Sequence, residues 1–186
     1  MSILSDNDIR HYIYSKSIII EPYDDNLLQP ASYDVRLHHI LAIPLIPTPD
    51  SHSNRIMSIT YPPEVNLINI KPKPYILAPG EFILGALEES ITINNMFVAR
   101  IEGKSSLGRL GLAIHITAGF VDPGWNGRLT IEIKNHAPYP VELSYLMKIG
   151  QVSFQLLLNP SFKKYGDKGL GSKYNNATQV EGVKTI

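Results

Sequence analysis

Residues 102–132 read EGKSSLGRLGLAIHITAGFVDPGWNGRLTIE, and this stretch decides both the fold class and the candidate site. It leads into the run 128–134, in which apolar Leu129, Ile131 and Ile133 alternate with polar residues. Strict alternation predicts a β-strand whose apolar side chains share the core face. Glu132 then lies on the opposite face, where a solvated position flanked by cations remains the alternative to a functional role.

Two turn dipeptides come just before that strand, Pro123-Gly124 and Asn126-Gly127. Proline presets φ for a turn, whereas glycine and asparagine tolerate positive φ. The chain is therefore expected to turn twice before it enters the strand.

The beginning of the stretch has the composition of an anion site. Lys104, Ser105, Ser106 and Arg109 lie within six residues of one another. Hydroxyls and free backbone N–H groups can donate to phosphate oxygens, and lysine and arginine supply positive charge. The spacing matches neither a P-loop nor a dinucleotide-binding glycine motif. On composition alone, a solvated loop fits equally well.

On both sides of residues 102–132, the sequence pattern is typical of an all-β protein. Short apolar runs are separated by Gly and Pro turns, which favours a barrel or jelly roll. One short helix is expected after Ser5, because Ser-x-x-Asp is an N-cap pattern. Residues 41–75 are rich in proline and predict an edge or a long excursion. Four charged residues are expected at the surface, with no role in a site: Asp34, Arg36, Glu88 and Glu89.

Composition excludes several classes of function. The chain has 186 residues, 17 basic and 17 acidic, and no cysteine. A net charge of zero does not favour nucleic acid or a membrane surface as partner. The absence of an apolar run and of a signal pattern predicts a cytoplasmic protein. Without cysteine, the chain cannot build the Cys-held zinc of the known nucleobase deaminases. His38 and His39 are expected on opposite sides of a strand, so no zinc site is predicted.

Composition changes near residue 159. Residues 1–158 are predicted to form one β-barrel domain, and residues 159–186 a Gly-, Lys- and Asn-rich arm. The arm carries Tyr165, Lys168 and Lys173-Tyr174, an aromatic and cationic set that suits a base and a phosphate. An arm that becomes ordered over a bound ligand is therefore expected.

The order and spacing of these motifs resemble the dCTP deaminases, a branch of the trimeric dUTPase superfamily. The likeness covers nearly the whole chain and is weakest at residues 41–75 and after Tyr174. The resemblance implies a distorted jelly-roll or β-barrel of the dUTPase-like type, with a short N-terminal helix and a C-terminal lid arm. The matching runs are residues 3–6, 29–37, 103–112, 115–124, 130–132 and 147–151.

The resemblance also implies roles for individual residues. Glu132 matches the catalytic carboxylate that moves protons, Ser105 a hydroxyl that places the water, and Arg109 a cation beside the reacting centre. Asp122 matches the residue that meets the deoxyribose, and Ala118 a position lining the base pocket. The implied nucleotide-binding set is Lys104, Ser105, Ser106, Arg109, Ala118, Asp122, Thr130, Ile131, Glu132, Gln151, Tyr165 and Lys173. The lid of the family usually carries a further Gln at the position of Ala177, and Gln179 is the alternative.

Family members are homotrimers with sites at subunit interfaces, and Mg²⁺ bound through the triphosphate is implied, with no protein-held metal. Lys104, Gly108 and Gly119-Phe120 are similar to members that convert dCTP through to dUMP and pyrophosphate. Deaminase-only members often carry Arg, Ala and His-Arg at these positions. The alternatives are release of dUTP, a dUTP diphosphatase, a non-catalytic nucleotide-binding regulator, or an all-β structural protein. Trp125 argues against a pure diphosphatase, which usually has a tyrosine there.

Overall fold

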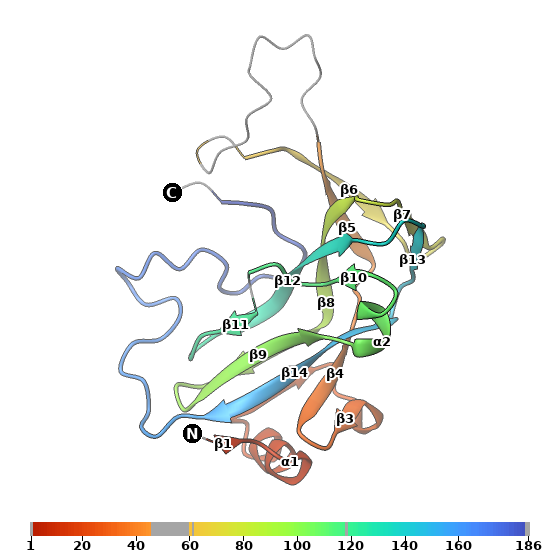
Figure 1. Cartoon of the computed structure of the whole chain (residues 1–186). Helices are drawn as coiled ribbons and strands as arrows, with labels where there is room; N and C mark the ends of the chain where they lie inside the picture. The colour runs from red at the N-terminus through yellow and green to blue at the C-terminus, as the bar shows by residue number, and fades with distance from the viewer. Residues whose placement is uncertain (1, 46–59, 61, 118, 185–186) are drawn as a thin grey trace.

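The computed structural model describes residues 2–45, 60, 62–117 and 119–184 (Figure 1). It is mostly β, with two short helices and a 3-10 turn at Asp25–Leu27. The all-β prediction is confirmed. In chain order the elements are β1 (Ser2–Ile3), α1 (Asp6–Tyr14), β2 (Ile18–Glu21), β3 (Leu28–Gln29), β4 (Ser32–Arg36), β5 (Ile40–Pro44), β6 (Val65–Asn69), β7 (Tyr75–Leu77), β8 (Phe82–Ile93), β9 (Phe97–Gly103), α2 (Ser105–Gly108), β10 (Leu112–Ala113), β11 (Phe120–Val121), β12 (Asn126–Asn135), β13 (Val141–Leu143) and β14 (Lys148–Leu156).

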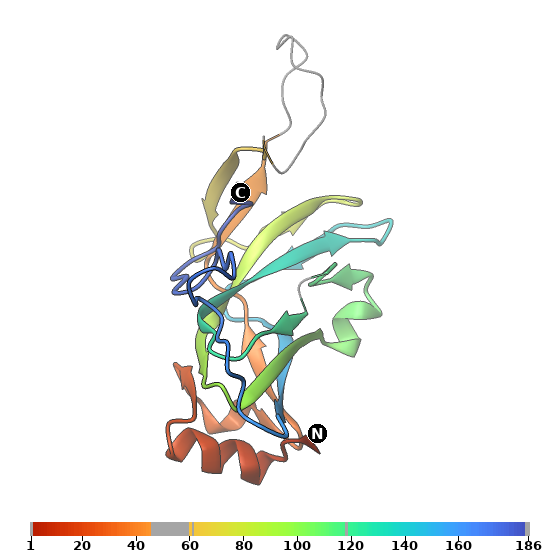
Figure 2. The same cartoon turned by 90° about the vertical axis from the view of Figure 1, so that its left-hand side faces the viewer.

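Two six-stranded antiparallel sheets enclose the core (Figure 2). One sheet has the order β11-β9-β14-β4-β3, with β1 also on β14. The other has the order β10-β12-β8-β5-β6, with β2 also on β8. Strands β7 and β13 form a separate pair. Because most neighbours are distant in sequence, the fold brings residues from the whole chain onto each face.

Strand β12 follows the predicted alternation. Its residues alternate between partly buried and buried along the whole strand, and Leu129, Ile131 and Ile133 pack in the core. The opposite face carries Arg128, Thr130 and Glu132, which are half-buried. At the other end of the chain, Ser5 caps α1 through a capping box with Asp8, as the Ser-x-x-Asp pattern predicts.

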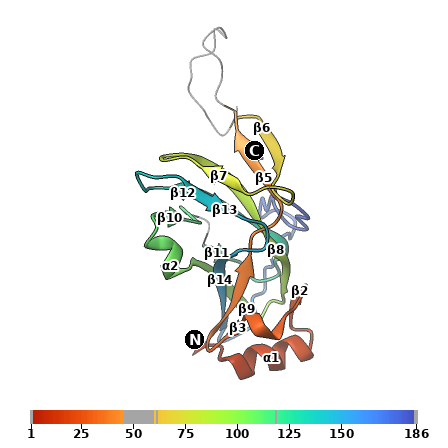
Figure 3. The ribbon, with the colours of Figure 1, turned by 90° about the vertical axis from the view of Figure 1, so that its right-hand side faces the viewer.

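The proline-rich region forms a hairpin at a sheet edge. Strands β5 and β6 pair from Ile40–Asn69 to Pro44–Val65, and the hairpin extends beyond the body of the two sheets (Figure 3). The edge prediction is confirmed for β6, which ends the order of its sheet, whereas β5 lies between β8 and β6. Residues 46–59 and 61, which also belong to this region, lie outside the described part of the chain.

The prediction that the four charged residues lie at the surface is wrong for Asp34 and Glu89, which are buried, whereas Arg36 and Glu88 are half-buried. Glu89 is fully buried and pairs with Arg36, whose Nε lies 2.7 Å from Glu89 Oε1. The backbone N–H of Arg36 also donates to Glu89 Oε2. Burial raises the pKa of Glu89, although its bonds to Arg36 partly offset this rise. Asp34 is 2% exposed and contacts two lysines instead of Arg36.

The arm lies along the outer face of the β12 sheet. Val180 packs there against Ala42 and Ala86, and the Ala177 carbonyl accepts from Arg128 N–H. Gly127 has a φ of +131° and no room for a side chain, since an added Cβ would lie 2.7 Å from the Ala177 carbonyl oxygen. Asn126-Gly127 was expected as a turn, but that prediction is wrong, because both residues lie in β12 and pair with β8. Glycine at position 127 of this strand allows the arm to approach β12. Within the described ranges, no helix has the length and apolar character of a membrane span.

Candidate functional site

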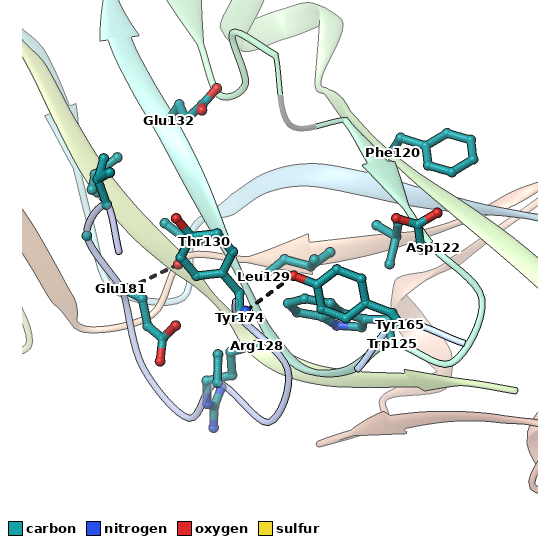
Figure 4. Close-up of a pocket in the computed structure, with 15 residues that line it drawn as sticks. Phe120, Asp122, Trp125, Arg128, Leu129, Thr130, Glu132, Tyr165, Tyr174 and Glu181 are labelled. Atoms are coloured by element: carbon teal, nitrogen blue, oxygen red, sulfur yellow. Dashed lines mark hydrogen bonds between the residues drawn. The ribbon is translucent and has the colours of Figure 1, made fainter. Parts of the chain in front are cut away.

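A cavity of about 240 Å³ opens between the outer face of β12 and the arm (Figure 4). Strand β12 supplies one wall, the β11–β12 turn a second, and the arm a third. The cavity is more apolar than polar, which suits a flat organic group held by a few polar contacts. Its lining residues are Leu84, Phe120, Val121, Asp122, Trp125, Arg128, Leu129, Thr130, Glu132, Tyr165, Tyr174, Ala177, Glu181, Gly182 and Val183.

Glu132 has one anchored and one free carboxylate oxygen. Oε2 accepts the backbone N–H groups of Ile116 and Thr117, at 2.7 Å and 3.0 Å. Within the described residues, Oε1 accepts no hydrogen bond. Anchoring one oxygen fixes the direction of the carboxylate, and the other oxygen is available to a water or a ligand. The arrangement is therefore suited to general acid–base chemistry.

The arm closes the cavity opposite Glu132. Tyr165 packs against Trp125, with ring centroids 5.2 Å apart, and its backbone N–H donates to the Pro123 carbonyl. The Tyr165 hydroxyl accepts from Tyr174 N–H, and Thr130 Oγ1 accepts from Glu181 N–H. The arm is therefore held to this wall by direct hydrogen bonds, two of which Figure 4 shows.

The structure brings only some of the predicted site residues together. Asp122, Thr130, Glu132 and Tyr165 line the cavity. The Ile131 side chain is 1% exposed and faces the core, so only its backbone can contact a ligand. The predicted position Ala118 lies outside the described residues.

A second group of predicted residues lies apart from the cavity. Lys104 occupies the N-cap position of α2 without a side-chain capping bond, and Ser105, Ser106 and Arg109 are exposed on or just after this helix. None of them is among the residues that line the cavity. Residues 105–108, for which a solvated loop was one alternative, form this short helix, which begins one residue after β9. We name Lys104, Ser105, Ser106 and Arg109 the α2 group.

Asp34 holds the lysine of the α2 group. Lys104 Nζ lies 2.6 Å from Asp34 Oδ1, and Lys148 Nζ lies 3.2 Å from Oδ2. Gln151 is the cross-strand neighbour of Asp34 and accepts from Ser32 Oγ. Because Asp34 is buried, it fixes the position of Lys104 at the start of α2, and Gln151 lies on the same part of the sheet.

Lys173 lines a second cavity, of about 430 Å³, which shares Asp122, Tyr165 and Tyr174 with the first. This cavity is formed mainly by the arm and also contains Asp122, Lys163 and Lys164. The Lys173 ammonium donates to the Lys184 carbonyl at 3.0 Å. Asp122 and Tyr165 thus contribute to both cavities, which places a cationic pocket next to the Glu132 cavity.

The sequence prediction missed several cavity residues. Arg128 shares the alternating face of Thr130 and Glu132, so the strand pattern already contained its signal. Tyr174, next to Lys173 in the arm, was noted in the sequence but was not predicted to line the cavity. Glu181 has no local signal, because only the return of the arm along β12 brings it to the cavity.

The prediction for the histidine pair is wrong. His38 and His39 lie between β4 and β5, outside regular strand, and their ring centroids are 4.1 Å apart. The strand breaks at this point, so the two rings do not alternate between faces. Burial, together with the nearby His39 and Arg128, lowers the pKa of His38 to about 4.

Comparison with known proteins gives the family. A family model described as dCTP deaminase-like matches residues 3–157. A protein of Beutenbergia cavernae named "dCTP deaminase, dUMP-forming" is 42% identical over 175 residues, which is 92% of this chain and 88% of that protein. A protein of Clavibacter michiganensis subsp. michiganensis with the same name is 43% identical, over 92% of this chain and 85% of its own.

A solved structure agrees on the fold. The 2'-deoxycytidine 5'-triphosphate deaminase from Agrobacterium tumefaciens aligns with 83% of this chain at a TM-score of 0.63 and 22% identity. The aligned part is 48% of that protein, so this chain spans about half its length. The fold and the cavity define an all-β protein with a carboxylate held at a largely apolar cavity. The extent of the family match makes the assignment specific: the chain belongs to the dCTP deaminase-like family.

Proposed function

We propose that this protein deaminates dCTP and then hydrolyses the resulting dUTP to dUMP and pyrophosphate. The single observation that carries the proposal is Glu132, a carboxylate with one anchored and one free oxygen in a pocket of suitable size. Family membership supports the substrate class, and relatives named as dUMP-forming, at 42–43% identity, support the second step. We place the activity in the cytoplasm, where deoxynucleotides are consumed.

In the proposed first step, water adds to C4 of the cytosine ring, and the exocyclic amine leaves as ammonia. Glu132 Oε1 accepts one proton from the water and delivers it to N3 of the ring, then accepts the second proton from the new C4 hydroxyl and delivers it to the amine, which leaves as ammonia while C4 becomes a carbonyl. The N–H groups of Ile116 and Thr117 keep Oε2 in place during this transfer. In the second step, a water attacks the α-phosphorus of dUTP and pyrophosphate leaves. We propose Ser105 and Arg109 as the groups that place and polarise the reacting atoms.

The nucleotide itself is expected to use both cavities. The apolar cavity takes the base and sugar, with the Asp122 carboxylate available to a sugar hydroxyl. Lys173 in the second cavity, with Lys104, Ser106 and Gln151, then meets the triphosphate. Among the described residues, no group of three or more metal-ligating side chains lies at either cavity. Mg²⁺ would therefore be held by phosphate oxygens and would balance their charge.

We further propose that the complete site forms between chains of a homotrimer. The α2 group lies outside the cavity that contains Glu132, so one chain alone does not assemble the predicted catalytic set. Exposed apolar side chains lie near both groups: Leu110 is 46% exposed, Ile116 58% and Phe120 52%. Such residues are typical of a surface that another chain covers.

Complementation between two inactive variants tests this arrangement. Glu132→Gln and Arg109→Ala chains are refolded together, so that mixed trimers form. If Glu132 and Arg109 of one site come from different chains, random mixing restores about a quarter of the sites, and activity returns. If both residues come from one chain, mixed samples stay inactive. Trimer formation is checked by light scattering against the chain mass of 20.8 kDa.

A product assay tests the function directly. Purified protein is incubated with Mg²⁺ and dCTP, and in parallel with dUTP, while ammonia, dUTP, dUMP and pyrophosphate are resolved. We expect dCTP to give ammonia, dUMP and pyrophosphate with little free dUTP. Accumulation of dUTP would instead show a deaminase alone. Turnover of dUTP without ammonia release from dCTP would remove the role of Glu132, and binding without turnover would indicate a regulator.

A further inference from the structure

Two imidazoles and a carboxylate meet outside the cavities. His38 and His39 join β4 to β5, and Glu88 lies on β8. One possible ligand atom from each residue lies within 4.8 Å of the other two. None of the three residues lines either cavity. The cluster is therefore separate from the proposed nucleotide site.

Two atoms of the cluster are buried without a partner. Among the described residues, His39 Nδ1 and Glu88 Oε2 have no hydrogen-bond partner although both atoms are inaccessible to solvent. An orphaned buried polar atom is unfavourable, and an ion is one of the groups that satisfies it. Both residues are only partly buried as a whole, so the cluster lies close to the surface.

The local fold positions these side chains. The pairing of β8 with β12 shifts between Arg128 and Thr130, which leaves residues 87–89 in a bulge of β8. Glu89 faces the core in the same alternating series as Ile83, Leu87 and Ile91, so Glu88 points to the opposite face, toward the histidines. On the other side, the His39 carbonyl accepts from Ile70 N–H, which fixes the histidine pair at the base of the β5–β6 hairpin.

Neighbouring groups hold the side chains of the cluster in place. The Tyr145 hydroxyl donates to Glu88 Oε1 at 3.4 Å, and the Tyr145 ring packs edge-on against His39. His38 Nδ1 accepts a 3.3 Å bond from Ile40 N–H, so His38 has a weak partner already. Arg128 is nearby and donates to the Leu87 carbonyl. His39 and Glu88 are consequently the ligands whose removal is most informative.

We propose that His38, His39 and Glu88 bind a divalent transition-metal ion, of which Zn²⁺ is the natural probe. Zn²⁺ accepts imidazole and carboxylate ligands at about 2.0–2.2 Å, so its ligand atoms lie roughly 3–4 Å apart. Small side-chain rotations bring the three atoms into that range. The ion ties the junction of β4 and β5 to β8 and so holds the hairpin to the barrel. Mg²⁺ does not fit, because it requires oxygen ligands.

Metal titration of the full chain tests the site. The protein is freed of metal with EDTA, exchanged into buffer, and titrated with Zn²⁺ by calorimetry; Co²⁺ absorption provides a second readout. We expect one ion per chain and a rise in Tm of about 5–10 °C at a hundredfold excess over Kd. His39→Ala and Glu88→Gln should each weaken binding by more than roughly tenfold. Excess Mg²⁺ should not compete.

A matched control separates this site from adventitious binding. His136 is exposed and outside the cluster, so His136→Ala should leave Zn²⁺ affinity unchanged. The Glu88→Gln variant keeps the side-chain volume, and circular dichroism verifies its fold. The proposal is overturned by an absence of stoichiometric binding, by affinity that survives both ligand substitutions, or by displacement of Zn²⁺ with Mg²⁺. None of these readouts depends on nucleotide turnover, so failure here leaves the proposed function standing.

Discussion

Glu132→Gln should reduce ammonia release from dCTP by about 10²–10⁴-fold, because the proposed proton carrier is replaced by a neutral amide. The substitution keeps the side-chain length. Its carbonyl oxygen can still accept the N–H groups of Ile116 and Thr117. The 115–117 loop should therefore stay in place, and nucleotide affinity should change little. The measurement is a single-turnover ammonia assay together with calorimetric binding of dCTP.

Two comparisons isolate the chemical effect. Glu142→Gln makes the same change at an exposed position on β13 and should retain wild-type turnover. Glu132→Ala removes the acceptor for both N–H groups, so it should also weaken nucleotide binding. Ammonia release by Glu132→Gln at the wild-type rate would refute the assigned role of this carboxylate.

Arg36→Met should lower the free energy of unfolding by about 3–5 kcal/mol, since it leaves the buried Glu89 carboxylate without its counter-charge. The Glu89 side chain is 0% exposed and that of Arg36 19%, so water cannot replace the guanidinium. For a chain of this size, the loss corresponds to a Tm decrease of roughly 10 °C. Urea unfolding and calorimetry measure it.

The pH dependence of this variant has a defined sign. Burial already raises the pKa of Glu89 above its ordinary value of 4.5, and removal of Arg36 removes a group that lowers it. The folded state then binds the Glu89 proton more tightly than the unfolded state. The loss of unfolding free energy in Arg36→Met should be small below pH 4.5, the ordinary pKa of glutamate, and should grow as pH rises through the raised pKa of Glu89.

Two further variants show whether the buried charge is the cause. Arg36→Met with Glu89→Gln removes the charge and keeps an acceptor for the residue-36 N–H, so most of the stability should return. Arg10→Met breaks a pair of similar geometry with Asp25, in which both side chains are at least half exposed, and should change Tm little. An equal loss in both single variants would contradict the explanation by burial.

Local patterns predicted much of the architecture. Alternation predicted the two faces of β12, Ser5 predicted the start of α1, and the proline-rich region predicted an edge. These features depend on residues close in sequence, for which periodicity and cap chemistry are sufficient. Glu89 was also within reach: Ile83, Leu87 and Ile91 alternate inward, and Glu89 continues that series. The expectation that Glu89 lies at the surface was based on its charge alone, and it was wrong.

Contacts across sheets could not be predicted in this way. Asp34 meets Lys104 across 70 positions, and Arg36 meets Glu89 across 53. His38 and His39 approach each other because the chain leaves the strand between β4 and β5, and a carboxylate oxygen of Glu88 on β8 lies within 4.8 Å of their ring nitrogens. The side-chain identities were visible, but their partners depend on strand order and register.

The sequence by itself determined the all-β class, the polar face of β12 and the motifs that resemble the family. Only the tertiary structure decided which of those residues meet: Glu132, Asp122 and Tyr165 share a cavity, whereas Lys104, Ser105, Ser106 and Arg109 lie elsewhere. The physical reason is the separation along the sequence over which each effect acts. Side-chain period and turn chemistry act over a few residues, while burial, pairing of charges and the course of the arm along β12 depend on how distant strands pack.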